Sequence, residues 1–150
     1  SLYLQRKRND VAKKEFQRAA ELSVTNVWDN GARHFNLGSA AVANLMAIHF
    51  AERNLEEAER AMEMAMPWAA SAQFVNQAIV LRLRQGRIED AVVIGSRSVK
   101  KFPDMGYLHF NYAEALAQAG DVGAACEHYR LASKLDRLTA WPARSFCEGQ

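Results

Sequence analysis

The stretch that decides the fold runs from Val75 to Leu135 and reads VNQAIVLRLRQGRIEDAVVIGSRSVKKFPDMGYLHFNYAEALAQAGDVGAACEHYRLASKL. Within it, Gly86 and Gly120 lie 34 residues apart, and so do Ala91 and Ala125. In each copy the glycine ends one helical pattern of apolar residues and a second pattern follows at once. This register predicts two consecutive helical hairpins that belong to one repeat. Stacks of such hairpins usually bind other chains.

The composition indicates an all-helical protein. Among 150 residues, 49% are hydrophobic and 24% are charged, while only three prolines and eight glycines interrupt the chain. Scarce breakers together with abundant Ala, Leu, Glu and Arg favour helix over strand. The 19 basic residues nearly balance 17 acidic ones, so no nucleic-acid partner is expected. No run of 18 apolar residues is present, so we expect no membrane insertion of this fragment.

The apolar periodicity predicts seven helices, joined mostly by short turns. A break is expected over 23–31, where β-branched residues precede Asp29-Asn30-Gly31. Asn54 and Ser71 are candidate helix caps, and Glu57 would complete a capping box with Asn54. The predicted helices are 4–22, 32–52, 55–66, 72–85, 88–101, 105–119 and 122–135.

The repeat resembles the tetratricopeptide repeat (TPR), a 34-residue pair of antiparallel helices. The resemblance rests on small, aromatic and glycine residues at matching places. The last copy supplies Ala113, Leu116, Gly120, Ala125, Tyr129 and Ala132; the middle copy supplies Val75, Gly86, Ala91, Ser98 and Pro103; the first copy supplies Leu45, Ala58 and Ala65. The middle copy departs from the pattern at Ile79, Arg82 and Gly95, where Gly95 replaces a ring.

The resemblance implies a single domain, 1–150, in which antiparallel hairpins stack as a right-handed TPR-like solenoid. Its repeats would be 32–70, 71–104 and 105–136. A divergent half-repeat or cap, 1–31, would precede them, and a tail, 137–150, would follow.

The resemblance also places a peptide-binding groove on the first helix of each hairpin. Amides prevail there, and amides can pair with a peptide backbone without demanding one sequence. The lysines that clasp a C-terminal carboxylate in related modules are missing, so chaperone-tail binding is not expected. The implied groove residues are Asn44, Gln73, Asn76, Gln77, Arg84, Tyr107, Phe110, Asn111, Glu114 and Gln118.

Catalytic chemistry has little support, and we expect no catalytic residue, metal site or cofactor. No HExxH motif, paired Cys/His spacing or glycine-rich phosphate loop is present. The four histidines fall on separate elements, with His49 and His109 at core or rim positions and His128 on an outer face. Cys126 is expected to be a buried thiol. A bridge from Cys126 to Cys147 is the alternative, and it would need an oxidising compartment.

Three functions remain open. The first is a non-enzymatic module that binds a protein or peptide. The second is an accessory soluble domain of a larger membrane-bound glycosyltransferase of the O-antigen-ligase type, and the third is a homo-oligomerisation domain. The second rests on a faint resemblance of the phrases Pro67-Trp68-Ala69, Arg84-Gln85-Gly86-Arg87, Lys101-Phe102-Pro103 and Asn111-Tyr112-Ala113.

The compartment is likewise open between the bacterial cytoplasm and an extracytoplasmic domain. Because the chain begins at Ser1 without a methionine or a recognisable signal peptide, we expect it to be a fragment of a longer protein.

Overall fold

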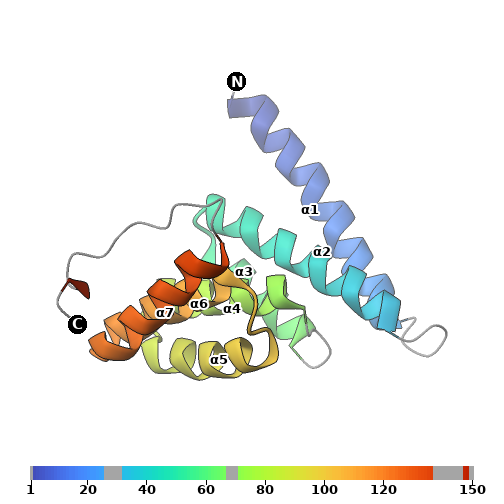
Figure 1. The fold of residues 1–150 in the computed structure, drawn as a ribbon. Helices are drawn as coiled ribbons and strands as arrows, with labels where there is room; N and C mark the ends of the chain where they lie inside the picture. Colours follow the sequence, from blue (N-terminus) through green and yellow to red (C-terminus); the bar gives the residue numbers. More distant parts are fainter. Residues whose placement is uncertain (1, 26–31, 67–70, 137–146, 149–150) are drawn as a thin grey trace. The chain divides into compact units, whose positions relative to one another are not determined.

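A computed structural model describes residues 2–25, 32–66, 71–136 and 147–148 of the chain. These residues form seven helices and no strand, so the all-helical prediction is confirmed (Figure 1). The first helix continues through Thr25, so the break predicted to begin at residue 23 is wrong; the rest of that predicted break, 26–31, lies outside the described residues. The helices are α1 (Leu2–Thr25), α2 (Ala32–Ala51), α3 (Leu55–Ala65), α4 (Ala72–Arg84), α5 (Ile88–Lys101), α6 (Gly106–Gln118) and α7 (Val122–Leu135).

The contacts divide the chain into two compact units, Ser1–Gln77 and Ala78–Gln150, with the boundary inside α4. In the first unit, α2 packs against both α1 and α3. In the second unit, α6 packs against both α5 and α7. The assignment of 1–150 to a single repeat domain, with its cap, repeats and tail, stays a prediction.

Three turns between paired helices share one backbone geometry. Arg53, Gly86 and Gly120 have φ values of 58°, 73° and 92°, in the left-handed region that glycine favours. In each turn, the residue after the left-handed one donates its N–H to the carbonyl five residues back: Asn54 to His49, Arg87 to Arg82, and Asp121 to Leu116. This is the Schellman arrangement that ends a helix. It recurs at spacings of 33 and 34 residues, the period read from the glycines and alanines.

Buried positions on the second helix of each hairpin recur at the same spacing. Small residues occupy two of them, which lets neighbouring helices approach closely. The first position holds Ala58, Ala91 and Ala125, and the last holds Ala65, Ser98 and Ala132. The position between them holds Met62, Gly95 and Tyr129, all buried. The core of α3, α5 and α7 is therefore built on one pattern whose middle side chain varies in size.

Gly95, which lacks the expected ring, packs against a ring from the neighbouring helix. A methyl group on Gly95 would lie 2.4 Å from Cδ2 of Tyr112 on α6. The ring of Tyr112 thus occupies the space that a side chain on α5 would need. The second departure, Arg82, is half-buried and donates from Nη1 to Oε1 of Gln85 at 2.9 Å.

Helix caps account for the sharp starts of several helices. The side chains of Asn54, Ser71 and Asp121 accept hydrogen bonds from the backbone N–H three residues later, as N-caps do. The capping box predicted at Glu57 is only half formed. The N–H of Asn54 donates to His49, and the carboxylate of Glu57 pairs with Arg60 at 2.6 Å.

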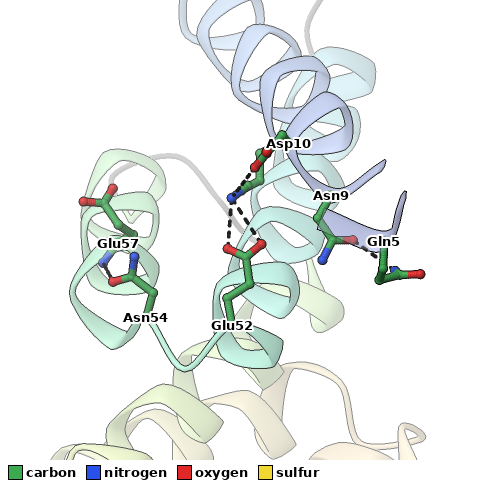
Figure 2. Close-up of polar contacts among 7 residues, drawn as sticks. Gln5, Asn9, Asp10, Glu52, Asn54 and Glu57 are labelled. Carbon is green, nitrogen blue, oxygen red and sulfur yellow. Dashed lines mark hydrogen bonds and ion pairs between the residues drawn. The ribbon is translucent and has the colours of Figure 1, made fainter. Parts of the chain in front are cut away.

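A three-residue ion-pair cluster joins α1 to the end of α2. Lys13 Nζ lies 3.0 Å from an Asp10 carboxylate oxygen and 2.9 Å from Glu52 Oε2 (Figure 2). The hydrogen bond to Glu52 raises the pKa of Lys13 above its usual value. Because Lys13 is only partly exposed, this cluster fixes α1 against α2 more firmly than a fully solvated ion pair would.

Candidate functional site

The predicted groove residues of the first unit include an amide pair that links two helices. Gln73 at the start of α4 donates from Nε2 to Oδ1 of Asn44 on α2 at 3.2 Å. Asn44, Asn76 and Gln77 are half-buried, whereas Gln73 is exposed. The structure therefore brings Asn44 and Gln73 together as one polar surface.

The predicted groove residues of the second unit lie mainly on α6. Tyr107, Phe110, Asn111 and Glu114 are half-buried there. Burial raises the pKa of Tyr107 above its usual value. The remaining two members, Arg84 at the end of α4 and Gln118 at the end of α6, are exposed.

The buried side chain of Tyr129 contacts two of the predicted groove residues of α6. The hydroxyl of Tyr129 on α7 donates to Glu114 Oε1 at 2.8 Å, and its ring meets the ring of Phe110 at an angle of 61° with centroids 5.6 Å apart. Tyr129 belongs to a buried cluster with Ala113, Leu116 and Ala125. Glu114 and Phe110 are thus held in place by the core, and such support is what a binding surface needs.

A cavity of about 630 Å³ lies between α1, α2 and α3 in the first unit. Its charges nearly cancel. Lys13 is held by two acids, and Glu57 is paired with Arg60, which leaves Lys14 and Arg18 at the exposed rim. The cavity therefore has no strong net charge with which to select a ligand. Its lining residues are Lys13, Lys14, Gln17, Arg18, Leu45, His49 and Glu57.

His49 lies in the wall of this cavity and is buried with one ring nitrogen unpaired among the described residues. Its side chain is only 9% exposed, and Nδ1 has no hydrogen-bond partner among the described residues. Burial, and then the charge of Lys13, lower the pKa of His49 below its usual range. The ring is therefore neutral at pH 7, and its polar atom is buried at a cost of about 1 to 3 kcal/mol.

The structure brings together two histidines that were predicted to lie on separate elements. His109 on α6 and His128 on α7 lie with their Nδ1 atoms 2.9 Å apart, and His109 Nε2 lies 2.8 Å from the carbonyl oxygen of Pro103. The placement of His128 on an outer face is wrong, because it is half-buried against His109 and Tyr112. Nothing in the local sequence pairs residues 19 positions apart on different helices. Among the described residues, no group of three or more His, Cys, Asp or Glu side chains could hold a metal ion.

Cys126 and Cys147 form a disulfide with their Cα atoms 5.5 Å apart. Cys126 is fully buried on α7, as predicted, but the expectation of a free thiol is wrong. Cys147 packs against the cluster that contains Tyr129. The bridge thus fastens a residue of the C-terminal segment to the core of the second unit.

Comparison with known proteins finds no family model that matches this chain and no matching curated protein. None of the described helices has the length and apolar character needed to span a membrane.

Proposed function

We propose that this chain is a non-enzymatic interaction module that binds a peptide or protein segment along the first helices of a right-handed, TPR-like stack of hairpins. Support for the stack comes from the three equivalent turns at Arg53, Gly86 and Gly120. Support for the binding role comes from the different residue types on the first and second helices of each hairpin. The second helices bury small residues against their neighbours, whereas the polar and aromatic residues that we assign to the binding surface lie on α2, α4 and α6.

The single observation that carries the proposal is that these first-helix residues have amide, aromatic and carboxylate side chains. The first unit offers amide donors and acceptors at Asn44 and Gln73, and the second unit offers a half-buried ring and carboxylate at Phe110 and Glu114. An extended peptide offers one N–H and one C=O per residue, which amides can pair with. Its side chains would find an aromatic surface that the core keeps in position.

A peptide array followed by fluorescence titration tests this role. We expect binding that weakens several-fold in Asn76→Ala and Asn111→Ala. Matched variants on the second helices, Glu63→Ala and Arg97→Ala, change exposed residues and should bind like the unaltered chain. Equal affinities for all four variants, or no binding by any member of the array, would rule out the groove. Light scattering of the same sample would reveal a dimer if the chain instead serves homo-oligomerisation.

The disulfide favours a second candidate, the accessory domain of a membrane-bound glycosyltransferase of the O-antigen-ligase type. Disulfides persist in oxidising compartments such as the bacterial periplasm, and the Cys126–Cys147 bridge suits a domain exposed there. Thiol labelling of the chain expressed with and without an export signal tests this. The candidate requires a bridge that forms only after export, together with membrane spans encoded elsewhere in the parent gene.

A further inference from the structure

His109 and His128 meet edge to edge in nearly one plane. Their ring centroids are 5.1 Å apart, which is the 2.9 Å between the Nδ1 atoms plus about one ring radius at either end. The two planes differ by 17°. The nitrogens and centroids are therefore almost collinear, and this is the geometry of a straight N–H···N hydrogen bond.

The backbone carbonyl of Pro103 determines where the protons lie. A carbonyl oxygen only accepts, so His109 Nε2, at 2.8 Å from it, must carry a hydrogen. In a neutral ring the Nδ1 of His109 then has a free lone pair, and the Nδ1 of His128 must donate to it. The result is a one-way chain from His128 through His109 to Pro103. One lone pair of the two rings is left, on His128 Nε2.

The surroundings favour a neutral His128 at pH 7. His109 is 5% exposed and His128 is half-buried. Burial, followed by the nearby His109, lowers the pKa of His128 below its usual range, and Glu127 opposes that change. Tyr112 of α6 meets His128 with ring centroids 4.6 Å apart. Glu127, which precedes His128 on α7, is exposed.

The other charged groups of α6 and of the segment before it are hydrogen-bonded elsewhere or exposed. On α6, Glu114 accepts the hydroxyl of Tyr129. Lys101 and Asp104, which flank Pro103 in the chain, are exposed to solvent. On α5, the residue that faces Tyr112 is Gly95, which has no side chain.

We propose that the His109–His128 pair is an acid-sensitive latch between α6 and α7, which tolerates one added proton and opens on the second. The first proton binds His128 Nε2 and leaves both hydrogen bonds intact. The second can bind only His109 Nδ1, because every other ring nitrogen is then protonated. Two N–H groups and two positive charges would then face each other across 2.9 Å. The rings separate, and α7 loses this polar link to α6, whereas the hydrogen bond from Tyr129 to Glu114 does not depend on the pair.

Amide hydrogen exchange of the full chain between pH 8 and pH 4 tests the latch. Opening takes up two protons where the closed pair is neutral and one where it already carries the first proton. The protection factors of α6 and α7 should therefore fall by up to about 100-fold per pH unit at the start of the transition and by about tenfold per pH unit at lower pH. The variant His128→Asn has an amide that can donate from about the place of Nδ1 but cannot titrate. We expect its protection factors to match those of the unaltered chain at pH 8 and to fall by no more than about tenfold per pH unit. The control His49→Gln, in the other unit, should keep the steep dependence.

Equal pH dependence in the unaltered chain and in His128→Asn would overturn the proposal. Ring nitrogen NMR of the unaltered chain gives a second decision that does not depend on the variant folding. The latch requires a proton on Nε2 of His109 and on Nδ1 of His128 at pH 8, followed by two separate titration steps. Any other tautomer pair, or two independent titrations near the ordinary histidine pKa, contradicts it.

Discussion

Gly95→Ala is the substitution that probes the packing of α5 on α6 most sharply. The added methyl group would lie 2.4, 3.0 and 3.1 Å from Cδ2, Cγ and Cβ of Tyr112. Carbon atoms in contact prefer roughly 3.5 to 4.0 Å, so the ring must move by about 1 Å. Overpacking of this kind costs about 1 to 3 kcal/mol. Alanine gains about 0.5 to 1 kcal/mol over glycine inside a helix.

The overlap outweighs the helix preference, and we expect Gly95→Ala to lose about 1 to 2 kcal/mol of unfolding free energy. Urea unfolding followed by circular dichroism measures this. Gly123→Ala on α7 is the matched control, because its methyl group would meet nothing within 4 Å, and it should be neutral or stabilising. The cost of Gly95→Ala should also vanish in a Tyr112→Ala background. An unchanged cost in that background, or no cost at all, would refute the contact.

Three further predictions concern the turns, His49 and the disulfide. Gly120→Ala should lower the unfolding free energy by about 1 to 2 kcal/mol, because φ is +92° and no neighbour lies within 4 Å to add a steric effect. Arg53→Gly should instead raise the unfolding free energy. Thermal unfolding measures both changes, and changes of the same sign would contradict the shared turn geometry. Because the folded pKa of His49 lies below the unfolded value, its protonation does not lower the stability above about pH 6.5 and lowers it progressively as the pH falls from there. His49→Leu should therefore raise stability by about 1 kcal/mol at pH 7 and flatten the acid side of the urea-midpoint profile, and a steeper profile would speak against this. Reduction of the disulfide, which spans 21 residues from Cys126 to Cys147, should lower the unfolding free energy by about 3 kcal/mol, whereas Cys147→Ser should be insensitive to the reductant.

Local chemistry explains why most helix limits could be predicted. The predicted helices 88–101 and 122–135 match α5 and α7, and the ends of α2, α3, α4 and α6 lie within one residue of the prediction. Glycines 86 and 120 have the left-handed φ that ends a helix, and Asp121 caps the next helix through its own side chain. These signals act over a few residues and can be read from the chain directly. The prediction that the first helix ends at residue 22 is wrong, because a helix can include β-branched residues despite their weak helix propensity.

Contacts between helices could not be predicted in the same way. His109 and His128 are joined because α6 and α7 pack side by side, and no local pattern encodes which faces meet. The same holds for the bridge from Cys126 to Cys147. Gly95 did give a signal, since an absent ring in a repeated core position requires another side chain to fill the space. That the filler is Tyr112 of the neighbouring helix follows only from the structure.

Chemical-shift mapping by NMR with a pooled peptide library tests the interaction role most directly. If the chain binds partners through its first helices, the backbone amides that shift will cluster on α2, α4 and α6, around residues such as Asn44, Asn76 and Asn111. The chemical shifts of the amides on the outer faces of α3, α5 and α7 will not change. Shifts confined to those second helices, or no shifts with any peptide pool, would contradict the proposed function.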